Sequence, residues 1–372
     1  NQRKMAREAR NDKDGRPVVY NTIGLNAAEL KVDESATAGK IVKMFPARDA
    51  QPIETAEDGN DVAVICDVTA FHAEGGGQLG DIGTIKAATG VIDVNVTKKL
   101  PDGSVIMIGT ITEGVINVGD AVEFAVDMAR KQDIARNHTA THLLHAALKQ
   151  VLGNHVNQAG SYVGPDRLRF DFSHFSAVSE AELQEVEQIV NNEILKATNV
   201  NIQELPIEEA KALGATALFG EKYGKIVRVV TVPGFSMEFC GGVHVDNTAN
   251  CGLFKIISES SSGAGVRRIE AVTGHGAVAH VKATEDMVKG LAGALKCRTT
   301  DVPSRLEALQ AELKAAQKKA EELAAEIAKA QVSDVAGSAK EIKGIKVLAQ
   351  KVSADSVDAL RNLGDQMRDS VG

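Results

Sequence analysis

The sequence predicts an α+β multidomain protein: a small antiparallel β-barrel, then an α+β domain that contains a zinc site, then a helical coiled-coil segment. Three observations carry this prediction. Short β-branched runs separated by turn residues fill residues 22–127, two histidine-containing pairs lie among alternating helices and strands within 129–274, and a Leu/Ile/Ala repeat runs through 303–331. At 372 residues the chain is long enough for two or three domains.

Composition narrows the class of protein. Hydrophobic residues make up 44% and charged residues 25% of the chain, as in ordinary soluble globular proteins. The net charge of −8 means that a polyanion would have to meet local basic patches. The sequence has four cysteines without a short repeated spacing, no signal peptide and no apolar run of about 18–20 residues. These features predict a cytoplasmic protein whose cysteines are reduced. The chain starts inside a charged run and stops without an obvious terminal element, so we expect a fragment of a longer protein.

The first two segments are a charged helix or solvated tail over residues 1–21 and the β-barrel over residues 22–128. Residues 1–16 hold six basic and three acidic side chains and few apolar ones. Strand-like runs follow at 39–44, 61–68, 83–85, 90–96, 104–111 and 122–126, with a Pro-Asp-Gly turn at 101–103. Several short strands at this spacing are typical of a small antiparallel barrel.

A glycine-rich loop over residues 71–81 interrupts the barrel pattern between two strands. Its run of three glycines, which includes Gly76 and Gly77, allows positive φ and a close approach by another backbone or a ligand. Glycines alone also fit a barrel bulge or corner. Gln78 and Asp81 beside the run favour a loop that closes over a ligand, whereas His72 is interpreted as a core histidine and not as a ligand.

A helix predicted over 127–152, with Asp127 as its N-cap, carries the first half of a metal site. His138 and His142 are four residues apart and therefore share one face of that helix. Cys240 and His244 follow at the same spacing on a loop that contains two glycines. Two imidazoles, one thiol and one further imidazole form a familiar tetrahedral zinc set.

The domain around this set is predicted over residues 129–285. Ser179-Glu-Ala-Glu182 is a capping box that opens a helix, and strand-like runs follow at 226–232, 253–257 and 265–272. Residues 286–335 carry Leu, Ile and Ala in a 3-4 rhythm, which predicts a helical coiled-coil segment that either dimerises or folds back on itself. Residues 336–372 begin a further α/β pattern that is cut short.

The zinc set leaves two chemical roles open. A metalloprotease is excluded, because Thr139 stands directly after the first histidine, where that motif has a glutamate as general base. Four protein ligands close a structural site, whereas a catalytic zinc keeps a position for water or substrate. Hydrolysis would need a fifth position, a weakly held ligand, or another group that activates the water. Glu238 and Gln158 are the candidates for positioning that water.

Three stretches resemble the editing domain of bacterial alanyl-tRNA synthetases. They are the helix residues 136–148, the loop Glu238-Phe-Cys-Gly-Gly-Val-His244 and the strand Gly265-Val-Arg-Arg-Ile-Glu-Ala-Val-Thr-Gly274. The barrel with its glycine-rich loop is similar to that family's β-barrel domain, and residues 286–372 are similar to its C-terminal region. Threonyl-tRNA synthetases share a related zinc-ligand pattern, but the barrel and the coiled coil fit the alanyl family better. The family's aminoacylation core normally precedes this region, and this chain has no room for it.

The resemblance implies an editing hydrolase that deacylates tRNA for alanine when it is mischarged with serine or glycine. Serine adds only a hydroxyl to alanine, and an amino-acid pocket rejects such an analogue by only about 10²-fold, so a second, hydrolytic site is needed. The implied zinc ligands are His138, His142, Cys240 and His244. The implied catalytic residues are Cys240, Gln158, Thr141 and Glu238, and the implied substrate- or tRNA-binding residues are Arg267, Gly76, Gly77 and Gln78.

Several of these roles have alternatives. Thr141, one residue before the second zinc histidine, either touches the substrate side chain or lies on the helix surface. Arg267 and Arg268 point to opposite faces of a strand, so Arg267 is either a contact to the acceptor stem or part of a surface ion pair. For the whole chain, the alternatives are a tRNA-binding module with a structural zinc that forms a homodimer through its C-terminal region, and a hydrolase of small esters that needs no RNA.

Overall fold

The computed structural model describes residues 20–371 apart from 23, 27–28, 218–222, 337–338, 350 and 352–356. The charged helix predicted for the N-terminus therefore falls on residues outside the described part of the chain. The chain divides into two compact units, Asn1–Val281 and Lys282–Gly372. None of the described helices is both long and apolar enough to cross a membrane.

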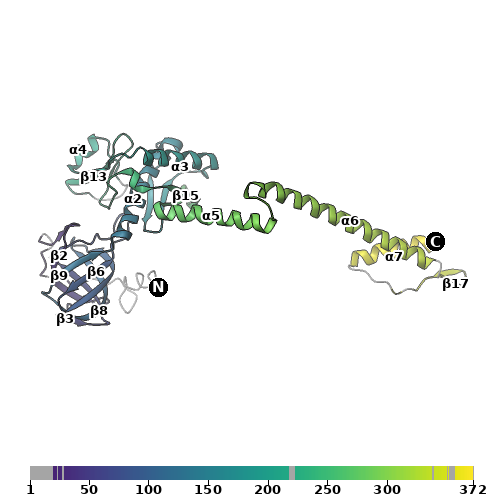
Figure 1. Ribbon diagram of the computed structural model, residues 1–372, viewed down its shortest axis with the longest axis horizontal. Coiled ribbons are helices and arrows are strands. Elements are labelled where there is room, and N and C mark those ends of the chain that lie inside the picture. The colour runs from purple at the N-terminus through teal and green to yellow at the C-terminus, as the bar shows by residue number, and fades with distance from the viewer. Residues whose placement is uncertain are drawn as a thin grey trace. The chain divides into compact units, whose positions relative to one another are not determined.

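Six antiparallel strands close a barrel at the start of the first unit (Figure 1). Their hydrogen-bonded order is β8–β4–β2–β9–β6–β7, and β7 pairs back to β8. The six strands are β2 (Ala38–Pro46), β4 (Asp61–Cys66), β6 (Gly83–Ala87), β7 (Gly90–Lys99), β8 (Val105–Asn117) and β9 (Ala121–Val126). Short strands accompany them: β3 (Thr55–Glu57) pairs with β8, and β1 (Lys31–Val32) pairs with β5 (Val68–Thr69). The predicted small antiparallel barrel is confirmed.

Strand β4 illustrates why these sequences form a closed barrel. Its side chains alternate between two faces, as in any strand. Val62 and Val64 join a buried cluster to which all six strands contribute, whereas Ala63 and Ile65 join a second buried cluster on the other face. Because β4 is buried on both faces, its sequence is an unbroken apolar run instead of an alternating one.

The rest of the first unit is an α+β domain with two antiparallel sheets. One sheet has the order β10–β11–β16–β15 and the other the order β12–β13–β14. The elements are α2 (Met128–Leu152), β10 (Gln158–Val163), β11 (Leu168–Ser173), α3 (Glu180–Leu195), β12 (Asn201–Pro206), α4 (Ile207–Ala212), β13 (Ile226–Val232), β14 (Ser236–Phe239), η1 (Thr248–Cys251), β15 (Phe254–Gly263) and β16 (Val266–Thr273). Helix α5 (Gly274–Leu295) begins in this unit and continues past Val281 into the second. The expected mixture of helices and strands is therefore present.

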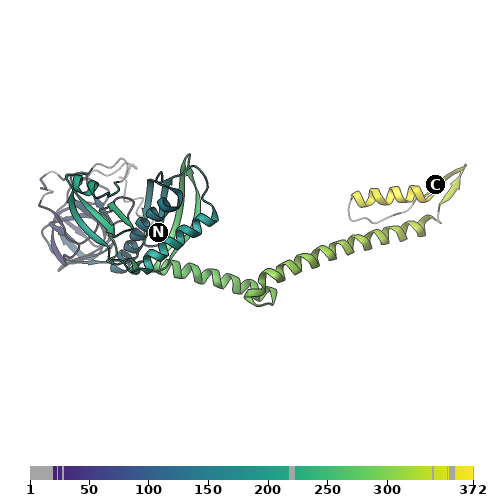
Figure 2. The same ribbon diagram turned by 90° about the horizontal axis from the view of Figure 1, so that it is seen from above.

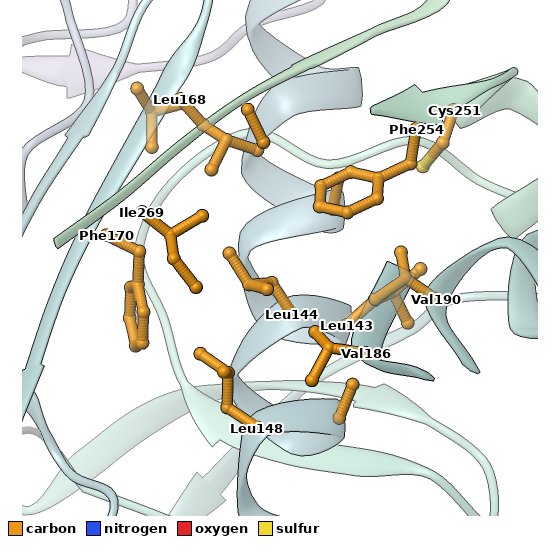
Figure 3. Close-up of a cluster of buried hydrophobic side chains, with 14 of the residues drawn as sticks. Leu143, Leu144, Leu148, Leu168, Phe170, Val186, Val190, Cys251, Phe254 and Ile269 are labelled. Carbon is orange, nitrogen blue, oxygen red and sulfur yellow. The ribbon is translucent and has the colours of Figure 1, made fainter. Parts of the chain in front are cut away.

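Helix α2 lies at the centre of this domain. The Asp127 carboxylate accepts a hydrogen bond from the Arg130 amide at 2.9 Å and caps the helix, as the sequence predicts. Figure 3 shows Leu144 and Leu148 of α2 in one apolar cluster with Phe170 and Ile269 of the first sheet and with Val186 and Val190 of α3. Nearly every α2 residue from 134 to 148 is buried, so polar side chains on the remaining faces of this helix are enclosed as well. Helix α3 begins with the predicted capping box of Ser179 and Glu182.

The second unit contains a long helix and a short β-hairpin. Its elements are η2 (Thr299–Asp301), α6 (Val302–Ala336), β17 (Lys340–Ile342), β18 (Ile345–Val347) and α7 (Val357–Val371). Helix α7, drawn in yellow, runs beside α6 in both views (Figures 1 and 2). The predicted long helix is present, and its apolar side chains are largely exposed, with Leu306, Leu313, Leu323 and Ile327 between 49% and 60%. The coiled coil itself stays a prediction.

Candidate metal centre

The fold brings two pairs of metal-binding side chains together. His138 and His142 lie on α2, and Cys240 and His244 lie on the loop that follows β14. Their ligand atoms all lie within 4.8 Å of one another. The Cys240 Sγ atom is 3.3 Å from Nε2 of His138 and 3.2 Å from Nε2 of His244. A thiolate and three imidazoles at this spacing form a donor set that fits zinc.

Two local features hold the Cys240 loop against α2. The Arg228 side chain, on the neighbouring strand β13, donates hydrogen bonds to the carbonyl oxygens of Cys240 at 2.8 Å and Gly242 at 2.7 Å. A Cβ atom on Gly242 would collide with the His138 ring and with Oε1 of Gln78. Glycine is therefore required at position 242 for the loop to approach the helix this closely.

Each of the three histidines meets a protein group through its Nδ1 atom. Nδ1 of His138 is 2.6 Å from Oε1 of Gln78, and Nδ1 of His244 is 3.1 Å from Oγ1 of Thr139. Nδ1 of His142 is 3.6 Å from the carboxylate of Glu238. These contacts leave the Nε2 atoms for the metal, which is the usual arrangement of outer partners that orient ligating imidazoles.

The Gln78 contact fixes the tautomer of His138. Oε1 of Gln78 accepts a hydrogen bond from the backbone amide of Val243 at 2.9 Å, so this atom is the carbonyl oxygen and not the amide nitrogen. His138 must then carry a proton on Nδ1, so Nε2 is the ring nitrogen that can bind a metal. The Gln78 side chain is 2% exposed, and its Nε2 atom is buried with no partner among the described residues.

The electrostatics of the cluster favour the metal-binding protonation state of Cys240 and His244, but not that of His142. Burial raises the pKa of the Cys240 thiol, but the charges and hydrogen bonds of His138 and His142 outweigh it and hold that pKa well below its usual range. Burial and the neighbouring His138 lower the pKa of His244 to about 3, so that ring is neutral at physiological pH. Burial would lower the pKa of His142, but Glu238 and Cys240 raise it to about 9. A metal must therefore displace one proton from His142 when it binds.

Glu238 supports the histidines and does not face open solvent. Its side chain is nearly buried, with Oε1 at 2.9 Å from Nδ1 of His145 and Oε2 facing His142. His145 is 2% exposed, and its ring centroid lies 5.2 Å from that of Phe170. Sequence reasoning missed the contact of Thr139 with His244, although Thr139 directly follows a ligand.

The glycine-rich loop reaches the metal centre from the barrel. It pairs with β10 through the hydrogen bonds from Leu79 N to Val163 O at 3.0 Å and from Val163 N to Gly77 O at 2.8 Å. Gly77 has a φ of +85°, and a Cβ atom there would collide with the backbone of Ser161. The Ser161 hydroxyl donates to the carbonyl of Gly76 at 2.9 Å. Of the three loop residues predicted to bind substrate or tRNA, Gln78 thus contacts a metal ligand and the two glycines contact β10.

A charged cluster at the same junction ties the loop to the first turn of α2. The Lys131 ammonium lies 2.8 Å from the carboxylate of Asp81 and 2.9 Å from that of Glu34. Nδ1 of His72 is 3.0 Å from Glu34, and the ring is only partly buried, so His72 lies at the edge of the barrel core and not within it. The barrel loop is therefore anchored on α2 only a few residues after it passes the metal centre.

The remaining predicted residues lie at different places in the domain. Thr141 is 4% exposed, and its hydroxyl donates to the backbone oxygen of Asn137 at 2.8 Å, so it does not lie on the helix surface. Gln158 lies at the start of β10 and donates to Ser161 at 3.3 Å. Arg267 forms a two-pronged ion pair with Glu259, at 2.5 and 2.7 Å, so the ion-pair alternative is present in the structure.

Two family models and many curated proteins match the chain. The "Threonyl and Alanyl tRNA synthetase second additional domain" matches residues 227–270, and "tRNA synthetases class II (A)" matches residues 1–130. Alanine–tRNA ligase of Bacillus velezensis is 45% identical over 372 residues, which is 100% of this chain and 42% of the relative. The ligases of Listeria welshimeri and Acetivibrio thermocellus are each 46% identical, over 99% and 92% of this chain.

Along its whole length, the chain is homologous to part of alanine–tRNA ligase. It spans about two fifths of the length of these relatives, 42% for both the Bacillus and the Listeria ligases named above. The residues that match the second additional domain include Cys240, His244 and Arg267, and the class II match covers the barrel. The metal centre therefore lies partly inside a domain model that alanyl and threonyl enzymes share.

Proposed function

We propose that this chain is the editing part of an alanine–tRNA ligase, a hydrolase that removes serine or glycine from tRNA for alanine. The observation that carries the proposal is the metal centre: one cysteine and three histidines, each histidine backed by a protein group at Nδ1. This donor set occurs in a chain homologous to alanine–tRNA ligase, and two of its four members, Cys240 and His244, lie in the residues that match the second additional domain.

We further propose that the metal is Zn²⁺, held by His138, His142, Cys240 and His244. When bound, zinc would supply a Lewis acid that polarises the ester carbonyl or the attacking water. The protein's part is to keep the donor atoms aimed: Gln78, Glu238 and Thr139 hold the three rings, and His145 holds Glu238. Glu238 acts in this proposal by orienting His142, because both of its oxygens already face histidines.

Thr141 is proposed to select the substrate side chain. Its hydroxyl donates its proton to Asn137 O, and this leaves lone pairs that can accept a hydrogen bond from the hydroxyl of a seryl group. The methyl group of an alanyl ester would cover the same oxygen without bonding it, whereas a glycyl ester leaves room for water. An unpaired buried polar group costs about 1–3 kcal/mol, roughly 5- to 150-fold in rate. Thr141→Val should therefore lower the ratio of seryl to alanyl hydrolysis; an unchanged ratio would remove Thr141 from the proposal.

The second candidate function is a tRNA-binding and dimerisation module with a purely structural zinc. Two observations favour it. Four protein donors within 4.8 Å suffice to close a structural site. The exposed apolar side chains of α6, such as Leu306 and Leu313, also offer a surface for a second copy of the chain. Arg267 would then serve RNA binding alone.

Release of serine from seryl-tRNA for alanine tests the proposal directly. The full chain, Cys240→Ala and the control Cys297→Ala are compared on seryl-tRNA and alanyl-tRNA. Cys297 lies in the second unit, outside the metal centre, so its loss should leave the rates unchanged. The proposal predicts fast seryl release that only Cys240→Ala abolishes, with alanyl-tRNA spared. Binding of tRNA without any release would favour the second candidate function.

A further inference from the structure

Arg228 of β13 lies directly beside the loop that carries Cys240. The backbone amide of Cys240 donates to the carbonyl oxygen of Arg228 at 3.0 Å, so these two residues are neighbours across the sheet. Val230 and Glu238 are the next pair along the same two strands. Because side chains alternate between the two faces of a sheet, Arg228 shares one face with Glu238. Glu238 faces His142 from there, so Arg228 lies on the sheet face that is turned toward the metal centre.

The protein uses only part of the Arg228 guanidinium. Its Nη1 atom makes both hydrogen bonds to the Cys240 loop, to the carbonyl oxygens of Cys240 and Gly242. Nε and Nη2 donate to no acceptor among the described residues, and neither is one of the buried polar atoms that lack a partner. These two nitrogen atoms are therefore held in place through Nη1 but stay open to solvent. Together they form the side of an arginine that can bind two oxygens of one phosphate or carboxylate.

Two other arginines of the same domain show what this side of a guanidinium binds. Arg267 and Arg268 each donate through Nε and Nη2 to both oxygens of one carboxylate. Among the described residues, Arg228 has no such partner. Glu204 stands directly opposite it on β12, but the two side chains form no ion pair, and no other described carboxylate forms one with Arg228. An unpaired guanidinium beside the metal centre is thus left for an anion from outside the chain.

The Cys240 loop is open at the point that Arg228 holds. Gly241 lies between the two carbonyl groups that accept from Arg228; it is exposed, and a Cβ atom built on it would meet no atom within 4 Å. The guanidinium is also close enough to act on a metal-binding ring. Burial first, and then the charge of Arg228, oppose the rise in the pKa of His142. An anion bound to Arg228 would therefore lie next to the metal centre.

We propose that Arg228 binds the phosphodiester on the 5′ side of the aminoacylated nucleotide, through Nε and Nη2. The proposal rests on the proposed function, because that function places a nucleotide ester at the metal centre. The phosphate of that nucleotide is only one ribose away from the ester, so it must lie close to the Cys240 loop. A chain with a net charge of −8 needs a local cation to hold a polyanion there. Arg228 thus holds the end of the RNA with one side of its guanidinium and the metal-binding loop with Nη1.

The affinity of the full chain for two matched RNA probes tests this contact. Each probe is a hairpin RNA whose unpaired 3′ end carries serine through a non-hydrolysable amide; the last linkage is a normal phosphate in one and a neutral methylphosphonate in the other. Wild type should bind the phosphate probe about tenfold more tightly, since the other probe lacks the charge-assisted hydrogen bonds. Arg228→Gln, which has no charge, should bind the two probes within about twofold of each other. Arg305→Gln on α6, outside the first unit, is the matched control and should keep the wild-type ratio.

The ratio of the two affinities separates phosphate binding from a purely structural role of Arg228. If Arg228 only held the Cys240 loop, Arg228→Gln would weaken binding of both probes alike and keep the wild-type ratio, and this result would overturn the proposal. Equal affinity of wild type for both probes would overturn it as well. Arg228→Lys is the second variant, in case Arg228→Gln does not fold. It keeps a cation that can donate to the loop but not the paired nitrogen atoms, so its ratio should also fall; an undiminished ratio there would contradict the proposal.

Serine release from seryl-tRNA for alanine, measured on the same proteins, separates this inference from the proposed function. A probe ratio that depends on Arg228, without serine release by wild type, would keep the phosphate contact and reject the editing activity. Serine release by wild type, with a probe ratio that does not depend on Arg228, would keep the activity and reject the phosphate contact.

Discussion

The two histidines of α2 in the candidate metal centre are contacted by different parts of the molecule. His142 faces the buried carboxylate of Glu238, which belongs to the same α+β domain. His138 faces the neutral carboxamide of Gln78, which belongs to the glycine-rich loop of the barrel. All four candidate ligands lie in one domain, but the groups that contact their rings come from two. The barrel therefore contributes a side chain to the candidate metal centre.

The two supports also differ in strength. A hydrogen bond to a charged group contributes about 1.5–3 kcal/mol, whereas one between neutral groups contributes about 0.5–1.5 kcal/mol. The carboxylate of Glu238 faces two histidines, His142 and His145, and the oxygen of Gln78 accepts from one histidine and one backbone amide. Loss of Glu238 should therefore disturb the metal centre more than loss of Gln78.

Glu238→Ala is expected to have the largest effect on metal affinity. It leaves the Nδ1 atoms of two buried histidines, His142 and His145, without an acceptor. Removal of an outer partner typically costs 10- to 100-fold in metal affinity, and we expect about 100-fold here. Competition for Zn²⁺ with a chromophoric chelator measures the change in zinc affinity. Glu209→Ala, on the exposed face of α4, is the control. If Glu238→Ala lost less zinc affinity than Gln78→Ala, Gln78 would be the stronger of the two supports.

Gln78→Ala should weaken zinc binding by about tenfold. The substitution removes the acceptor that keeps the His138 proton on Nδ1, and it leaves the amide of Val243 unpaired. Gln78→Glu is the matched variant, because a carboxylate oxygen can accept both hydrogen bonds and should restore most of the affinity. The same titration checks both variants. Wild-type affinity in Gln78→Ala would mean that the barrel contributes nothing to the metal centre.

The sequence indicates the four candidate metal ligands because each pair is local, and the structure brings the two pairs together. His138 and His142 share a helix face at a spacing of four, and Cys240 and His244 share one loop. Their outer partners are not local: Gln78 lies 60 residues from His138, in another domain, and Glu238 lies 93 residues from His145. No spacing rule connects residues that only the tertiary fold brings together.

Helix α2 shows a second limit of sequence patterns. An apolar stripe predicts which face of a helix meets the core, and the leucines of α2 do meet it. The pattern does not tell that the polar faces are covered too, here by the barrel loop and by the Cys240 loop. The sequence therefore leaves Thr141 with a surface alternative, although it is buried. Similarly, β-branched runs predicted the barrel strands, but not that β2 pairs with both β4 and β9.

Thr139→Val should have a smaller effect than either change above. The Thr139 hydroxyl lies 3.1 Å from Nδ1 of His244 and also accepts from the amide of Val245 at 3.2 Å. Valine keeps the shape of the side chain but removes both hydrogen bonds, each between neutral groups. We expect zinc affinity to fall by about threefold to tenfold. Thr139→Ser, which keeps the hydroxyl, should bind zinc like wild type; equal losses in both variants would point to packing and not to the hydrogen bond.

The smallest expected effect concerns the anchor between the barrel and α2. Burial raises the pKa of Glu34, but hydrogen bonds and charges from His72 and Lys131 outweigh it and lower that pKa to about 2. A carboxylate with a lowered pKa in the folded state stabilises the fold above its unfolded pKa of about 4.5, and this contribution disappears as the pH falls toward 2. Glu34 is 44% exposed, so we expect at most about 1 kcal/mol. Urea unfolding at pH 7 and pH 3 should therefore show Glu34→Gln destabilised at pH 7 and less destabilised at pH 3. An equal difference at both pH values would mean that Glu34 acts through packing, and that the barrel is anchored to α2 mainly by Asp81.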